Sequence, residues 1–224
     1  NNSVAIGVSA GRDAQEVNAV AIGYNAGRDS QGERSIAMGS NAGYSNIGNN
    51  CVAIGWLAGE TGTGSAFDSV AVGKEAGRSN QAEYCIAIGA GAARGGVGSS
   101  GQAADAIAIG RAAGLTSQGT HSIGIGRNAG RINQGSSAVA IGYGAGRDDQ
   151  HDNSIVINSS GSDLNTEGTS RCYIKPLREG VASSNSLVTY NENTGEVGHA
   201  RFTDTSTDPG LLSFLCKTSS NTYV

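Results

Sequence analysis

The feature that most constrains the fold is a short internal repeat. The words VAIG, IAMG, VAVG, IAIG and IGIG recur along the chain, and each ends in a glycine. These glycines are Gly7, Gly23, Gly39, Gly55, Gly73, Gly89, Gly110, Gly126 and Gly142. Their spacings are 16, 16, 16, 18, 16, 21, 16 and 16 residues, and a tenth copy, IVIN at 155–158, follows after another 16. A period of 16 is too short for a helix pair and suits one coil of a β-solenoid.

The repeat predicts an all-β fold, a parallel β-solenoid or β-roll of about ten 16-residue coils. We expect the solenoid over residues 1–158, where the repeat holds, and a polar linker over 159–171. Residues 172–224 are expected to form a small C-terminal β segment that caps the solenoid and takes part in trimerisation. Within it, Ser186 to His199 has the pattern of a β-hairpin, and 201–215 holds two weaker strand candidates.

Composition excludes several other classes of protein. Glycine makes up 36 of 224 residues without recurring at every third position, and there are only 2 prolines, so the chain is not collagen. Aromatic residues at 5% and charged residues at 15% argue against an α/β enzyme core and a coiled coil. The net charge of -4 argues against a general nucleic-acid binder. No apolar run approaches 18 residues, so no membrane insertion is expected. Because the chain opens inside a repeat, we expect a longer parent protein.

Each predicted strand is a triplet in which a small residue stands between two large ones, as in Val20-Ala21-Ile22. Side chains alternate between the two faces of a strand, so we expect the large pair to fill the interior and the small residue to face outward. An outward column that stays small favours the close approach of another chain. The sequence therefore predicts a subunit interface at Ala5, Ala21, Ala37, Ala53, Ala71, Ala87, Ala108 and Ala140.

Other positions of the repeat have structural interpretations. The repeat glycine becomes Asn158 in the tenth copy, and both residues tolerate a positive φ, which predicts a left-handed corner. Cys51 and Cys85 stand where other coils have serine or alanine and are interpreted as small packing residues. A glutamine lies eight residues after the repeat glycine in six of nine coils, which predicts a ladder of stacked amides. These residues are Gln15, Gln31, Gln81, Gln118, Gln134 and Gln150.

An arginine lies five residues after the repeat glycine, again in six of nine coils. Guanidinium groups stacked about 5 Å apart repel one another unless negative charge is near. Acids such as Asp13, Asp29 and Asp148 could neutralise them, or the column could form a basic stripe that binds an anionic glycan or lipid headgroup. Trp56 could stack on a sugar near this stripe or have a packing role. The candidate ligand stripe is Arg12, Arg28, Arg78, Arg94, Arg131, Arg147 and Trp56.

No motif indicates catalysis, and no cofactor or metal is expected. Gly7-Val8-Ser9-Ala10-Gly11 matches GxSxG, but both glycines are repeat positions and the serine is not repeated. The four cysteines lack CxxC spacing. A glycan-cleaving tailspike would need two facing carboxylates, and isolated acids cannot be paired from sequence. An ice-binding solenoid would need a threonine column, which the repeats lack.

The units Val20 to Gly27 and Val139 to Gly146 resemble the head repeats of trimeric autotransporter adhesins. This resemblance covers about residues 3–158 and implies a left-handed β-roll assembled as a homotrimer. The chain departs from that pattern in its 16-residue period and its added Ala-Gly-Arg and Gln positions. The stretch YIKPLREG and the later NSLVTYNENTGEV resemble segments of fibre and spike proteins of large DNA viruses and phages.

Together these resemblances imply a non-enzymatic structural fibre at the virion surface that attaches to host cells. The expected partners are two further copies of the chain, a host cell-surface glycan or protein, and other fibre or tail components of the virion. The alternative is the head of a bacterial trimeric autotransporter adhesin at the bacterial cell surface. A glycan-cleaving tailspike and an ice-binding solenoid are the less favoured hypotheses.

Overall fold

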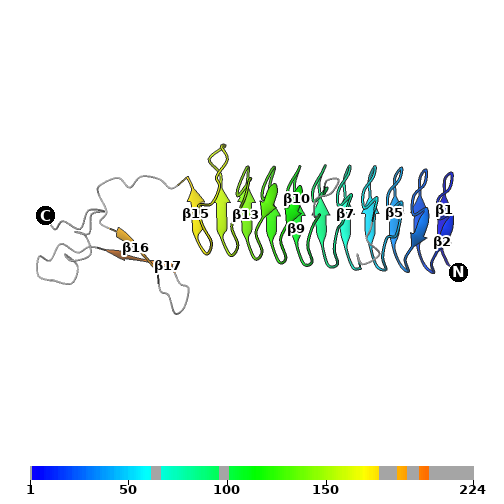
Figure 1. The fold of residues 1–224 in the computed structure, drawn as a ribbon, viewed down its shortest axis with the longest axis horizontal. Helices are drawn as coiled ribbons and strands as arrows, with labels where there is room; N and C mark the ends of the chain where they lie inside the picture. The colour runs from blue at the N-terminus through cyan, green and yellow to red at the C-terminus, as the bar shows by residue number, and fades with distance from the viewer. Residues whose placement is uncertain (1, 62–66, 96–100, 177–185, 191–196, 202–224) are drawn as a thin grey trace, which may run out of the picture. The chain divides into compact units, whose positions relative to one another are not determined.

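A computed structural model divides the chain into two units, Asn1–Leu177 and Arg178–Val224. It describes residues 2–61, 67–95 and 101–176, together with the strands of 186–190 and 197–201. The first unit is a parallel β-solenoid whose coils follow one another in sequence order (Figure 1). The described residues contain strands and turns and no helix, so the predicted all-β solenoid is confirmed.

One long parallel sheet of eleven strands forms a complete side of the solenoid. Each repeat triplet pairs in register with the next, so that Val20 lies opposite Ile36 and Ala21 opposite Ala37. The strands are β1 (Val4–Ile6), β3 (Val20–Ile22), β5 (Ile36–Met38), β6 (Val52–Ile54), β7 (Val70–Val72), β8 (Ile86–Ile88), β9 (Ile107–Ile109), β11 (Ile123–Ile125), β13 (Val139–Gly142), β14 (Ile155–Asn158) and β15 (Cys172–Lys175).

Shorter strands on a second side of the coil are paired less continuously. They form two separate two-stranded sheets, joined elsewhere by single bridges such as Ser45 to Thr61. The members are β2 (Asp13–Gln15) with β4 (Asp29–Gln31), and β10 (Thr116–Gln118) with β12 (Ile132–Gln134). Four coils therefore have the second strand that the 16-residue length indicates, and others have a single bridge in its place.

The predicted orientation of the triplets is wrong. The middle alanines of the coils from Ala21 to Ala140 point inward and are at most 3% exposed, while the flanking valine and isoleucine side chains lie half-buried or exposed on the outer face. A column buried inside its own chain cannot touch a neighbour. The predicted interface at Ala21, Ala37, Ala53, Ala71, Ala87, Ala108 and Ala140 is thus corrected, whereas Ala5 is exposed.

The narrow interior explains why the small residue points inward. The opposite wall of each coil lies so close that a Cβ added to Gly77 would be 3.2 Å from the Cβ of Ala71. A second buried alanine column, exemplified by Ala26 and Ala42, packs against the first. An isoleucine would not fit between these walls without moving the backbone, because protein interiors are close-packed.

The predicted glutamine ladder is confirmed. Gln134 is 2% exposed, accepts a hydrogen bond from the Gln118 amide at 3.0 Å and donates one to Gln150 at 3.1 Å. The same amide donates to the carbonyl of Ile123 at 2.9 Å, which satisfies backbone across the coil. Gln102 is a further rung that receives a bond from Gln81, although the extra residues of its own 21-residue coil move it out of the 16-residue count.

The ladder is interrupted in the third coil, where Ile47 takes the glutamine position. Beside it lies a cavity of about 20 Å³, bounded among others by Cys51, Ser69 and Gln81. Cys51 and Cys85 occupy a buried column otherwise made of serine and alanine, which confirms their interpretation as packing residues.

The repeat glycines adopt a positive φ and also allow the coils to approach closely. Gly39 has φ +125°, and a Cβ built on it would lie 2.7 Å from the carbonyl oxygen of Gly55. We call these nine residues, Gly7 to Gly142 at the repeat positions, the corner glycines. The analogy with Asn158 is wrong, because Asn158 stays in β14 without a positive φ and its amide donates to the carbonyls of Tyr143 and Ser162.

The solenoid extends past the predicted boundary at residue 158. Cys172–Lys175 is β15 and pairs in parallel with β14, so the C-terminal segment does not begin at 172. The predicted linker 159–171 forms part of another coil, in which the carbonyl of Leu164 accepts a hydrogen bond from Gly146 and Thr166 is buried.

The second unit contains the predicted hairpin, with β16 (Ser186–Tyr190) antiparallel to β17 (Val197–Arg201). The weaker strand candidates after residue 201 lie outside the described residues.

Candidate functional surfaces

The arginine column lies on the outside of the solenoid, and its members are half-buried or exposed. Each described arginine of the column except Arg131 pairs with a carboxylate. The pairs are Arg12 with Asp13 (2.6 Å), Arg28 with Asp29 (3.4 Å), Arg78 with Glu60 (2.5 Å), Arg94 with Glu75 (2.8 Å) and Arg147 with Asp163 (2.6 Å). These acids offset the repulsion between stacked guanidinium groups.

Hydrogen bonding shifts the pKa of three of these groups, Arg12, Asp13 and Arg147. The side-chain bond from Arg12 is the main reason that the pKa of Asp13 is lowered, and the same bond raises the pKa of Arg12. The bond to Asp163 likewise raises the pKa of Arg147. Most of the predicted ligand stripe thus already has anionic partners within the chain, which leaves less charge for an external ligand.

The isolated acids considered for a tailspike have partners other than a second carboxylate. Glu75 and Asp163 bind arginines, Asp105 lies 3.7 Å from the His121 ring nitrogen, and Asp68 accepts a hydrogen bond from the amide of Asn50 at 3.0 Å. The described residues bring no three His, Cys, Asp or Glu side chains together as metal ligands. In the same part of the chain, no helical segment has the length and hydropathy of a membrane span.

The outer face of the long sheet carries a continuous apolar surface. Each strand of the long sheet from β1 to β14 contributes two large apolar side chains to it, and Ile174 of β15 extends it. In the interior coils Ile54, Ile88 and Ile125 are still 37–38% exposed. We call this surface the apolar face, and its described members with more than a third of their area exposed are Val4, Ile6, Met38, Ile54, Ile88, Ile125, Ile141, Ile155, Ile157 and Ile174.

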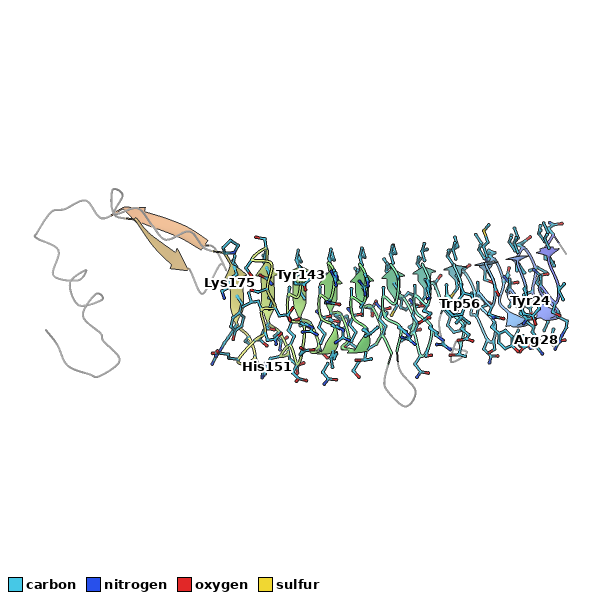
Figure 2. The ribbon with its side chains drawn as sticks, turned by 90° about the horizontal axis from the view of Figure 1, so that it is seen from above. Tyr24, Arg28, Trp56, Tyr143, His151 and Lys175 are labelled. Atoms are coloured by element: carbon cyan, nitrogen blue, oxygen red, sulfur yellow. The ribbon has the colours of Figure 1, made fainter. Side chains whose placement is uncertain are left out.

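A further column runs along the residues that directly follow the corner glycines. Backbone bonds hold it in register: the amide of Glu75 donates to the carbonyl of Trp56 at 2.8 Å, and that of Asn128 donates to Arg111 at 3.0 Å. We call it the corner stripe, with the members Tyr24, Ser40, Trp56, Lys74, Ala90, Arg111, Arg127 and Tyr143. Tyr24, Trp56 and Tyr143 form a row along the solenoid in Figure 2.

The corner stripe combines exposed aromatic rings with cations. Trp56 is 46% exposed, and the Lys74 ammonium lies 5.0 Å from its ring centroid. The guanidinium of Arg127 lies 5.6 Å from the ring centroid of Tyr143, which is 40% exposed. Sequence reasoning singled out Trp56 here and missed the cations, because aromatic, basic and small residues alternate in a column that repeats no single type.

Comparison with known proteins found no match among protein-family models, curated proteins or solved structures.

Proposed function

We propose that this chain is a structural section of a homotrimeric attachment fibre on a virion. The observation that carries the proposal is the apolar face, an uninterrupted band of valine and isoleucine along the solenoid. An exposed apolar patch of this extent favours a partner surface, because apolar area removed from water stabilises association by about 25 cal/mol per Å². The partner proposed is the same face of two further copies.

Repetition also supports an attachment role. A solenoid presents each surface position once per coil, and three chains would present it three times as often. Contacts that are weak singly then combine into high avidity. The resemblance of the C-terminal segment to viral fibre and spike proteins supports a place at the virion surface. The alternative is the head of a bacterial adhesin, which a membrane anchor encoded downstream in the same gene would establish.

A pair of lysine substitutions tests the assembly. Ile88→Lys places a charge at the centre of the apolar face, and Thr120→Lys adds the same charge at an exposed position outside it. We expect Ile88→Lys to reduce the particle mass in light scattering while the β signal in circular dichroism is kept, and Thr120→Lys to leave the mass unchanged. An unchanged mass in Ile88→Lys would contradict assembly through this face.

The proposed location of the protein at the virion surface is tested by labelling with antibodies. Gold-labelled antibodies against the chain should mark projections on virions, whereas label on bacterial cells would favour the adhesin alternative.

A further inference from the structure

We infer that the corner stripe binds an anionic polysaccharide that lies along the solenoid axis. This inference rests on the proposed attachment function and names both the surface and the chemical class of its ligand. The predicted ligand site is thereby moved from the arginine column, whose charges are largely neutralised, to the corner stripe, whose cations form no ion pair among the described residues.

The positive charge of the corner stripe favours an anionic ligand. Lys74, Arg111 and Arg127 are exposed, and none of them forms an ion pair within the part of the chain that the structure describes. In the adjoining column, one residue further along each coil, the described acid is Glu75, whose carboxylate binds Arg94 at 2.8 Å and whose side chain is only 15% exposed. On the other side the apolar face begins. These three cations are therefore free to bind anions that a partner supplies.

Aromatic rings lie at both ends of the three cations and favour a sugar as the ligand. Trp56 precedes Lys74 and Tyr143 follows Arg127, and each ring lies against the neighbouring cation. Aromatic faces offer an apolar platform to the C–H face of a sugar ring, while a guanidinium binds carboxylate or sulfate through two parallel hydrogen bonds. Both kinds of contact occur in the same straight column.

The spacing of the cations along the solenoid favours a sparsely charged polymer. Five coil steps separate Trp56 from Tyr143, about 24 Å at roughly 4.8 Å per step. Three cations over that length correspond to one charge in about 8 Å, whereas a single nucleic-acid strand carries one in about 3.4 Å. The sparse charge, in a chain of net charge -4, fits a polysaccharide with one carboxylate or sulfate per disaccharide better than a nucleic acid.

Two triple variants with the same loss of charge test the inference. The first is Lys74→Ala, Arg111→Ala and Arg127→Ala in the corner stripe. The matched control is Arg12→Ala, Arg28→Ala and Arg78→Ala in the arginine column, whose members are already paired. Binding is measured on immobilised hyaluronan and heparin, with dextran as the neutral glycan and single-stranded DNA as the competing polyanion, and the particle mass of every variant is recorded.

We expect the wild type to bind an anionic glycan and not dextran. The corner-stripe variant should bind at least tenfold more weakly, and the control variant less than threefold more weakly. A further variant, Trp56→Ala with Tyr143→Ala, should weaken binding about tenfold without changing its salt dependence. Equal losses in both triple variants, tighter binding of DNA, or no glycan binding by an intact assembly would overturn the inference while leaving the fibre proposal in place. A corner-stripe variant that loses its assembly would instead assign these cations to subunit contacts.

Discussion

At the scale of single residues, the fold depends on backbone positions that few side chains can occupy. Each full coil places several residues at positive φ, among them the corner glycine and the residue four positions later, which is glycine except at Ala93, as with Gly23 at +128° and Gly27 at +52°. At the corner glycine a side chain would also collide with the next coil. Strain and collision can be separated experimentally because Gly161 has a positive φ with no atom near its missing Cβ.

Gly39→Ala should lower the free energy of unfolding by about 3 kcal/mol or more, since it adds a collision with Gly55 to the backbone strain. Gly161→Ala should cost about 1 kcal/mol, because only the strain applies. Denaturant titrations followed by circular dichroism compare the two variants. Equal losses would show that the close approach of the coils at Gly39 is not limiting.

The ladder amides are expected to stabilise the interior as a connected set. Gln134→Leu would leave the carbonyls of Ile123 and Ala138 without their side-chain donor and would break the bonds to both neighbouring glutamines. We expect a loss of about 2–4 kcal/mol, because buried polar groups without partners cost about 1–3 kcal/mol each. Ser136→Ala, on the surface of the same coil, should change stability by less than about 0.5 kcal/mol in the same titration.

The buried thiols predict a difference in reactivity and a pH dependence. Desolvation raises the pKa of Cys85 from 9.0 to about 11, whereas Cys172 is exposed. Iodoacetamide at pH 8 should therefore label Cys172 in the native protein well before Cys51 or Cys85, as peptide mapping would show.

Between pH 9 and 11 the unfolded chain loses the Cys85 proton while the folded chain keeps it, so the free energy of unfolding falls as pH rises. The fall attributed to Cys85, measured as wild type minus Cys85→Ser, should be roughly 2 kcal/mol. Parallel curves for the two proteins over this range would contradict the burial of this thiol.

At the scale of the elements, stability should be lowest where the ladder is interrupted. Ile47 cannot continue the amide bonds, and a cavity of about 20 Å³, large enough for one water, lies beside it. Repeat proteins open in contiguous segments whose stability depends on contacts between neighbours.

We therefore expect backbone amides of β6 and β7 to exchange with deuterium faster than those of β11 and β13, where the ladder runs without interruption. Hydrogen-exchange mass spectrometry resolves these segments. Slower exchange in β6 and β7 would show that the amide ladder does not set local stability.

Periodicity predicted the elements better than it predicted their orientation. The 16-residue count located the strands of the long sheet from β1 to β14 and the amide ladder, because those positions repeat in type as well as spacing. Alternation within Val20-Ala21-Ile22 fixed which residues share a face and left open which face is inside, since that depends on the width of the coil. The opposite wall, at Gly77 and Ala26, is what makes the interior too narrow for the larger pair. Residues 159–171 were not recognised as a coil because they lack the repeat word.

The candidate sites were predictable to a similar degree. The arginine column was visible because one residue type recurs, but its neutralisation depends on acids as distant as Glu60 from Arg78. The corner stripe becomes apparent only when backbone hydrogen bonds place Trp56, Lys74 and Arg127 in one line.

At the scale of the whole molecule, the solenoid buries little large apolar surface within itself. Its interior is formed mainly by alanine, serine, cysteine and glutamine, with Ile47, Leu57 and Val156 as buried larger apolar residues, and its other valines and isoleucines lie mostly on one outer face. Alanine contributes little to the hydrophobic free energy compared with about 1.5–3 kcal/mol for a fully buried valine or isoleucine. Burial of the apolar face between chains would provide this missing stabilisation, and assembly and folding would then be coupled.

The mass of the native particle, measured by light scattering on a sizing column, shows whether the apolar face is buried between chains. We expect a particle of about three times the chain mass of 22.4 kDa. This mass should persist on dilution until the chains unfold. A folded monomer of 22.4 kDa that remains stable on dilution would contradict it, because the apolar face would then be exposed to water without cost to the fold.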